Sequence, residues 1–269
     1  SDGGVYHKLT TLKFNPMNEL PHQDLGERYV VMKTTAATLD FVLVMAKSAR
    51  LWKTRDSAYS NRCLAAARRA SACSVANPDS LYKQPSHVRT GPYEAKRVSD
   101  ERFAAAAELA LATGDTLLFK PFREQIARHG TVSSWQDVGA LGLYTILAHP
   151  GFFAAERIPA LAVLTDSATK LRDRVRRTGY ATPIDSADFV WGSNSVECMQ
   201  GVHLVQAFKA TGDTSFLRGA EAALDYVLGM NPHDSSFVTG IGIRSAKHPH
   251  HRPSVSDTVV EPVPGFLVG

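Results

Sequence analysis

Long hydrophobic runs are absent from these 269 residues. A helix that crosses a membrane needs about 18 or more consecutive apolar residues, and no run in the sequence approaches that length. We therefore expect no membrane partner. The opening residues SDGGVYHK also lack the charged and then apolar order of a signal peptide. Export of the parent protein would require a signal upstream of Ser1.

Cysteine is scarce, with only Cys63, Cys73 and Cys198. An odd number cannot be fully paired, and the spacing matches no CxxC metal site. A large excess of one charge is absent as well, because 30 basic residues face 26 acidic ones and the formal net charge is +4. The basic residues form no stripe interleaved with aromatics, so we expect no nucleic-acid partner.

Strand-like alternation is also scarce, whereas helical periodicity runs through most of the chain. Between Tyr29 and Trp52, for example, apolar residues recur at spacings of three and four. With 44% apolar residues the chain can bury a sizeable core, as one domain or as most of a larger one. Amphipathic stretches predict helices joined into antiparallel hairpins, over residues 29–52, 57–75, 99–112, 116–129, 134–148, 154–176, 195–210 and 214–229.

A five-residue sequence, ATGDT, occurs at 112–116 and again at 210–214. In each copy the glycine suits the left-handed end of one helix, and the aspartate suits the start of the next. Ser99 is expected to cap another helix start in the same way. The repeat predicts helical hairpins of one kind, which form a toroid when they close into a ring.

Longer non-helical stretches lie between the hairpins and are rich in glycine, proline, histidine and aromatics, at 1–26, 77–97, 178–194 and 230–269. Such loops are where a helical scaffold carries a site. In the last of them, Pro249 stiffens the chain before His250, His251 and Arg252. Two imidazoles and a guanidinium suit hydrogen bonds to hydroxyls or to a carboxylate. A metal site and a purely structural loop are the alternatives.

The same loop resembles the histidine-containing active-site signature of glycoside hydrolase family 9, the cellulase family, at Ser236, Phe237, Val238, Thr239, Gly242, Arg244, Pro249, His250 and Arg252. Three more segments are similar to that family: WGSNS at 191–195, LGMNP at 228–232 and PVPGFLVG at 262–269. The opening DGGVYHK looks like the branch whose members often carry an N-terminal immunoglobulin-like module. The resemblance covers essentially the whole chain, in order.

The resemblance implies an all-α fold, the (α/α)6 toroid of the family, here incomplete with about eight of the twelve barrel helices. Residues 1–269 then form one partial catalytic domain that lacks both ends. Ala104 and Ala110 stand where the family often has large aromatics, and looser packing, a degenerate homologue and an engineered chain are the open explanations.

The resemblance also implies residues that bind sugar. His250 and Arg252 would hydrogen-bond the sugar near the point of cleavage. His7 would approach it on the glycone side, with Tyr6 beside it. Trp191 would give an aromatic platform on which a pyranose face stacks, and a tryptophan buried in the core is the alternative.

Asp100, Glu101 and Asp137 match positions that bind calcium in similar proteins. Hard oxygen ligands suit Ca²⁺, so the resemblance implies a structural calcium site. The alternative is that Asp100 and Glu101 favour a helix N-terminus through their charge. Both interpretations of these carboxylates stay open. The resemblance implies no cofactor for the hydrolytic chemistry itself.

The catalytic carboxylates of the family are missing. An inverting glycosidase needs one carboxylate that activates water and one carboxylic acid that protonates the leaving oxygen. The family takes the base from an Asp-Ala-Gly-Asp motif and the acid from an Asn-Glu-type segment, and neither occurs in this sequence. The pairs Asp185–Asp188 and Asp257–Glu261 are not convincing substitutes. We therefore expect this chain to be inactive on its own.

The leading interpretation is a secreted or periplasmic hydrolase whose complete form cleaves β-1,4-glucan by inversion. Its partners are then a β-linked oligosaccharide or polysaccharide and the missing remainder of its own domain. A rival keeps the fold and changes the sugar to chitosan oligomers, as an exo-β-glucosaminidase, with Asp24 or Glu27 facing the amino group. A rival of another class is a non-catalytic carbohydrate-binding or scaffold protein.

Overall fold

The computed structural model describes residues 2–269 and divides into two compact units. The first unit comprises residues 2–14 and 27–163, and the second comprises residues 15–26 and 164–269. The boundary between the two units falls within the helix α5 (Arg157–Val175). Within residues 2–269, the helices are all too short or too polar to cross a membrane.

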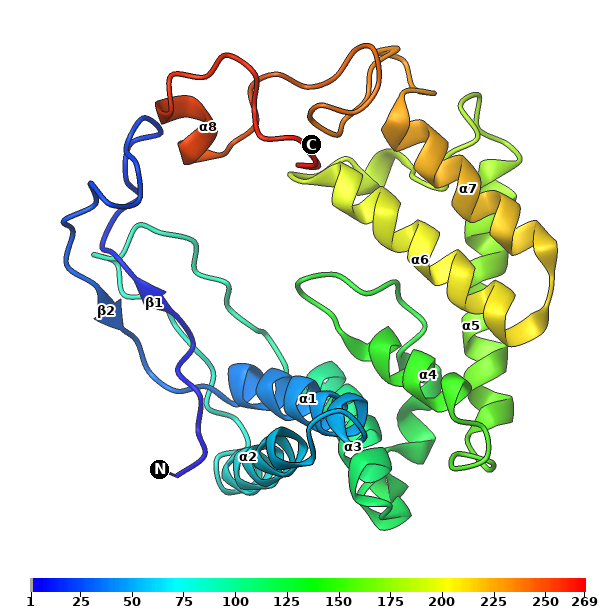
Figure 1. Ribbon diagram of the computed structural model, residues 1–269. Helices are drawn as coiled ribbons and strands as arrows, with labels where there is room; N and C mark the ends of the chain where they lie inside the picture. Colours follow the sequence, from blue (N-terminus) through cyan, green and yellow to red (C-terminus); the bar gives the residue numbers. More distant parts are fainter. Residues whose placement is uncertain (1) are drawn as a thin grey trace. The chain divides into compact units, whose positions relative to one another are not determined.

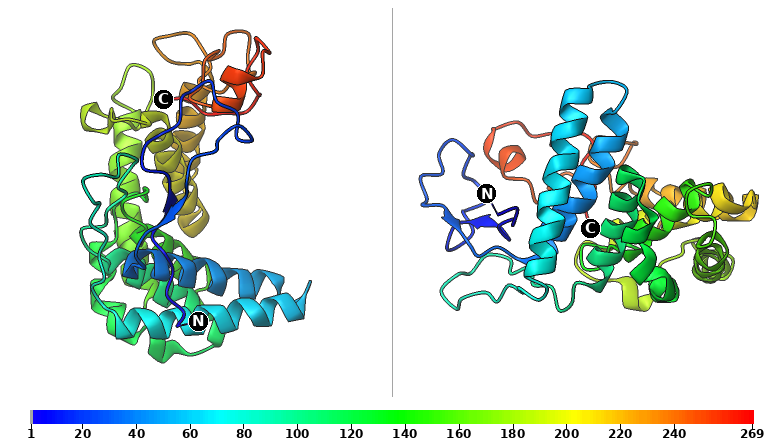
Figure 2. Two further views of the ribbon diagram at one scale, coloured as in Figure 1. Left: turned by 90° about the vertical axis from the view of Figure 1, so that its left-hand side faces the viewer. Right: turned by 90° about the horizontal axis from the view of Figure 1, so that it is seen from below.

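The first unit is built around a helical hairpin of α1 (Thr35–Trp52) and α2 (Ser57–Ala76), which lie side by side (Figures 1 and 2). Each helix starts at a side-chain cap, because Thr34 accepts from the backbone N–H of Ala37 and Asp56 accepts from that of Tyr59. Small buried residues, such as Ala46 on α1 and Ala67 on α2, let the two helices approach closely.

The helix α3 (Ser99–Thr113) contributes to two hydrophobic cores. Ala105 and Leu109 pack into the core shared with α1 and α2, whereas Phe103 and Ala110 pack into a second core with α4 (Gly139–Ala148). Ala104 and Ala110, at positions where the family often has large aromatics, are both fully buried. A Cβ on Gly142 of α4 would come within 3.2 Å of the Ala104 backbone, so small residues here let two helices pack closely.

Three sequence predictions of helix boundaries need correction in this unit. Residues 116–129 form no α-helix but two 3₁₀ segments, η1 (Thr116–Leu118) and η2 (Lys120–Arg128). Phe119 and Phe122, three residues apart, both pack against the second core, and three residues per turn place such a pair on one side. The helix predicted from 134 begins at Gly139, because Ser134–Asp137 form a turn. Residues Tyr29–Val30 form a strand, β2, that pairs antiparallel with β1 (Leu9–Thr10).

The two copies of ATGDT adopt the same capping geometry, as the sequence predicts. Gly114 and Gly212 both end a helix in the left-handed region, at φ 74° and 76°. Asp115 and Asp213 both accept the backbone N–H two residues later, at 2.9 and 2.8 Å. The cap expected at Ser99 is wrong, because Ser99 is itself the first residue of α3. The N-cap position is taken by Val98, which makes no side-chain hydrogen bond.

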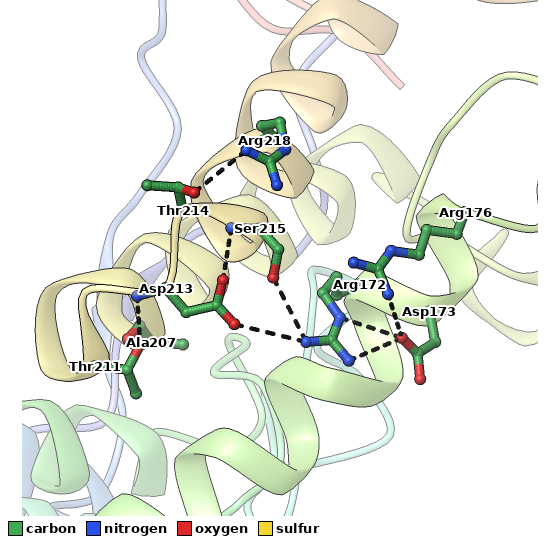
Figure 3. A network of polar contacts seen from close by, with 9 residues as sticks. All are labelled: Arg172, Asp173, Arg176, Ala207, Thr211, Asp213, Thr214, Ser215 and Arg218. Carbon is green, nitrogen blue, oxygen red and sulfur yellow. Dashed lines mark hydrogen bonds and ion pairs between the residues drawn. The ribbon is translucent and has the colours of Figure 1, made fainter.

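The second unit contains the hairpin of α6 (Ser193–Thr211) and α7 (Thr214–Leu228). Figure 3 shows how the turn between them meets α5: Arg172 lies 3.8 Å from the carboxylate of Asp213, which in turn accepts from Ser215. In the same picture Thr211 donates back to Ala207. The α6–α7 turn is thereby fixed at both of its helix ends.

Much of the second unit is loop, with only the short segments η3 (Ser186–Asp188) and α8 (Arg252–Ser256). Two stretches of the loop after α7 pair with each other, since Thr239 and Phe266 are joined by a backbone hydrogen bond of 2.9 Å. The hydroxyl of Thr239 is fully buried and donates to Val263. Part of the family signature therefore builds the loop and does not face a ligand.

Candidate functional site

The first unit carries a cavity of about 620 Å³ that we call the His7 pocket. It lies between the chain start, the first turn of α1, the loop 77–97 and the turn before α4. Its lining mixes one imidazole, two aromatic rings and four carboxylates, supplied by His7, Asp40, Tyr93, Glu94, Glu101, Trp135 and Asp137.

His7 enters the pocket in a fixed orientation. Its ring stacks on Tyr82 at 4.4 Å between centroids, and its Nε2 lies 3.1 Å from the carbonyl of Pro92. A carbonyl only accepts, so Nε2 carries the proton and Nδ1 faces the hydroxyl of Thr34 at 3.4 Å. Tyr6 is not part of the pocket lining, and its ring lies under the ammonium of Lys33.

Two exposed aromatic rings form a wall of the His7 pocket. Tyr93 and Trp135 meet edge to face at 6.0 Å, and they are 59% and 70% exposed. Aromatic faces that stay open to a pocket suit an apolar face of a ligand such as a pyranose ring. Neither residue was predicted as a site residue, although Tyr93 lies in the glycine-, proline- and aromatic-rich loop 77–97 and Trp135 lies two residues before Asp137.

Carboxylates on α1 and α3 form the acidic part of the pocket. Burial raises the pKa of Glu101 to about 8, and its Oε2 makes no hydrogen bond. Burial, together with the charge of Asp100, raises the pKa of Asp40 to about 6. Asp100 is satisfied, since its carboxylate accepts from the backbone N–H of Val138 at 3.0 Å.

The predicted calcium ligands lie close together but are already engaged. Arg97 donates to Asp137 at 3.0 Å and lies 4.0 Å from Asp100, so a guanidinium supplies the positive charge between these two carboxylates. Of these three predicted ligands, Glu101 alone keeps an unpartnered buried oxygen. Throughout residues 2–269, no three His, Cys, Asp or Glu side chains converge as a metal-binding group. A calcium ion at these residues would have to displace the Arg97 guanidinium, and calcium binding stays a prediction.

The second unit has its own hollow, of about 300 Å³, that we call the Trp191 hollow. Its lining includes Trp191, Ser195, His250 and Phe266. Trp191 is 90% exposed, so the alternative of a core tryptophan is wrong. The structure therefore brings together two predicted site residues that lie 59 positions apart in the sequence.

Arg252 does not line the Trp191 hollow. Its guanidinium donates to the backbone carbonyls of Asn15 and Pro16, at 2.8 and 3.1 Å. His251 lines the hollow but is occupied, as the N-cap of α8 and as a neighbour of the Phe266 ring at 4.3 Å. Of the three adjacent polar residues, His250 alone is an exposed lining residue of the hollow.

The loop that ends at Trp191 is anchored from two helices. Arg174 on α5 lies 2.8 Å from Asp185 and 3.3 Å from Asp188. From α6, Gln200 donates to Asp188 at 2.9 Å. A second anchor is the buried carboxyl of Glu197, which accepts from the hydroxyl of Thr182 at 2.6 Å; its burial raises its pKa to about 7.

These contacts also bear on the carboxylates considered as substitutes for the catalytic pair. Asp185 and Asp188 share Arg174, and Glu261 pairs with Lys247. Asp257 accepts the backbone N–H of Val259 at 3.0 Å. Each has a structural partner, as expected for residues that build loops.

Neither acidic residue suggested for an amino sugar lines the His7 pocket or the Trp191 hollow. Asp24 accepts the backbone N–H of Gly26 at 2.9 Å, and Glu27 accepts from the hydroxyl of Tyr29. The suggestion of an amino-sugar contact at these two positions has no support from either cavity.

Helical hairpins whose loops present aromatic rings and imidazoles in two cavities are consistent with a carbohydrate-active protein. The sequence profile of glycosyl hydrolase family 9 matches residues 1–269, and the chain belongs to this family. Its fold is all-α and corresponds to part of the (α/α)6 toroid of that family, as the sequence predicts.

Among its relatives, a xyloglucan-specific endo-β-1,4-glucanase of Bacteroides ovatus is 38% identical over 286 residues, covering 100% of this chain and 48% of the relative. Endoglucanase D of Acetivibrio thermocellus is 32% identical, with 99% and 43% covered. A solved endoglucanase of Alicyclobacillus acidocaldarius superposes with a TM-score of 0.93 at 31% identity, with 99% and 51% covered. The chain thus spans about half the length of the relatives it matches.

Proposed function

We propose that this chain is the part of a β-1,4-glucan hydrolase that holds the sugar chain. The observation that carries the proposal is the His7 pocket, in which Tyr93 and Trp135 leave their rings open beside a fixed imidazole. A stacking surface next to a hydrogen-bonding group is what a pyranose requires, because its faces are apolar and its rim is polar.

Relatives support the substrate class. Those described above are named as endoglucanases, one of them specific for xyloglucan. A further solved neighbour, with a TM-score of 0.92 and 31% identity, holds a cellobiose-like isofagomine. We infer a β-1,4-linked glucan as the ligand of this chain and a secreted or periplasmic parent, since a polymeric substrate lies outside the cell.

In this proposal the two cavities bind the sugar chain, and the carboxylates that cleave the bond come from other parts of the parent. Trp191 stacks on one sugar while His250 hydrogen-bonds near it, and the His7 pocket takes a sugar on the glycone side. The inverting pair of carboxylates belongs to the motifs that this sequence does not contain. The chain by itself is then expected to bind glucan without turning it over.

Calorimetry with cello-oligosaccharides and xyloglucan oligosaccharides tests the proposal. Trp135→Ala and Trp191→Ala should each lower the affinity about tenfold, since truncating an aromatic anchor typically costs more than about 1 kcal/mol. Trp52→Ala is the matched control, because this partly exposed tryptophan packs against Tyr59 in the α1–α2 hairpin and lines neither cavity. Unchanged affinity in both site variants would refute the proposal.

Chitosan oligomers in the same assay separate the glucan from the glucosamine alternative. Release of reducing ends, measured together with the intact mass, separates a binding fragment from a complete enzyme. Turnover by material of about the 29.2 kDa of this chain would contradict the assignment of catalysis to the missing motifs.

A further inference from the structure

Lys8 follows His7 in the opening motif, and the site described above gives it no role. We propose that Lys8 is a positioning residue, which holds the loop 77–97 so that Tyr93 forms the wall of the His7 pocket. The inference rests on the proposed function, because it assumes that this pocket binds the sugar.

The ammonium of Lys8 is bound by acceptors of that one loop. It donates to the side-chain oxygen of Gln84 and to the carbonyl of Gly91, both at 2.6 Å, and to the hydroxyl of Thr90 at 3.3 Å. An ammonium has three donors, so none is left for a ligand. The charge also lies 5.4 Å from the ring centroid of Tyr82, which is a cation–π distance.

Gln84 extends this network across the loop. Its amide donates to the carbonyls of Val88 and Thr90, at 3.0 and 2.7 Å, and its backbone N–H donates to Glu94 at 2.8 Å. Lys8 therefore closes a network that reaches both ends of the segment 84–94. In Figure 1 this loop, in teal, runs beside β1.

Tyr93 depends on this support. Its backbone is in the left-handed region, at φ 51°, which costs a non-glycine residue energy and persists only when its surroundings hold it. Its ring lies directly over Gly91, where an added Cβ would come within 2.6 Å of the ring. The two residues directly before Tyr93 are held, Gly91 by Lys8 and Pro92 by His7.

Lys8 acts through Tyr93 and not on the ligand, because it is not one of the residues that line the His7 pocket. Lys8→Met keeps most of the aliphatic stem and removes the three donors. We expect it to weaken binding of cello-oligosaccharides about tenfold, the effect of a lost hydrogen bond to a charged group. Lys170→Met is the matched control, since Lys170 is 69% exposed and makes one ion pair with Asp166 of its own helix, at 2.6 Å.

A double-mutant cycle with Tyr93→Ala tests whether the effect passes through the ring. If it does, Lys8→Met costs affinity when tyrosine is present and costs little in the Tyr93→Ala background. A purely structural role of Lys8 would lower the melting temperature equally in both backgrounds and leave the two affinity losses additive. If Lys8→Met does not fold, Lys8→Arg enters the same cycle, because it keeps the charge and changes its geometry.

The outcomes distinguish the positioning role of Lys8 from the proposed function of the His7 pocket. Unchanged affinity in Tyr93→Ala would refute the sugar-binding role of this wall, and with it the proposed function of the pocket. Weaker binding in Tyr93→Ala, with unchanged affinity or additive losses for the Lys8 variant, would overturn the positioning role alone. Coupled losses, with the affinity of Lys170→Met unchanged, would support both.

Discussion

Glu197 offers a quantitative test of how the Trp191 loop is held. Its side chain is fully buried, and one carboxyl oxygen binds Thr182 while the other makes no hydrogen bond. Burial is the main cause that raises its pKa from an ordinary 4.5 to about 7, and the charge of Asp188 adds to it. The folded protein therefore binds a proton here more tightly than the unfolded chain does.

The sign of the pH dependence follows from this difference. Between pH 4.5 and about 7 the folded state holds a proton that the unfolded state releases, so stability falls as the pH rises through this window. The full loss is about 3 kcal/mol from Glu197, at about 1.4 kcal/mol for each pH unit. Above pH 7 this loss of stability is complete, and Thr182 then donates its hydrogen bond to a buried, ionised carboxylate.

Glu197→Gln removes the titration and keeps an oxygen that can accept from Thr182. Urea unfolding between pH 4.5 and 8 should show a shallower fall for this variant, with the difference from the parent reaching about 3 kcal/mol. Glu221→Gln, on the exposed side of α7, is the control. Glu101 in the first unit also has a raised pKa, but it is present in both proteins, so its contribution to stability cancels when parent and variant are compared. Equal slopes for parent and Glu197→Gln would show that this carboxyl is not held protonated, and would refute the reasoning.

Three further predictions concern other parts of the chain. Arg174→Met should loosen the loop that carries Trp191 and weaken oligosaccharide binding severalfold, whereas Arg172→Met should leave the affinity unchanged; calorimetry on both variants decides. Gly142→Ala should lower stability by about 1–3 kcal/mol in thermal unfolding, because its Cβ would lie 2.6 Å from a buried phenylalanine ring. If calcium binds, its removal by a chelator should lower the melting temperature and Glu101→Gln should abolish that effect; an equal melting temperature with and without calcium would contradict the calcium prediction.

Much of the architecture was predictable from the sequence, because helix formation and capping depend on residues close together in the chain. Periodicity located α1, α2, α3 and the α6–α7 hairpin, and the repeated ATGDT located two caps with nearly identical geometry. Prediction failed at 116–129, where an apparently helical pattern forms 3₁₀ segments. There the packing of Phe119 and Phe122 against the core favours the 3₁₀ conformation of the backbone. That core is assembled from residues far apart in the sequence, so a local pattern does not reveal it.

The site was predictable only in part, for the same reason. The resemblance to the family identified Trp191 and His250, and the structure places both in one hollow. Three other features were visible only in the tertiary structure. Arg252 binds backbone carbonyls, Arg97 pairs with the predicted calcium ligand Asp137, and Tyr93 forms a pocket wall. Residue types specify which interactions a side chain is able to make. Which partner it meets depends on chain segments brought together by folding.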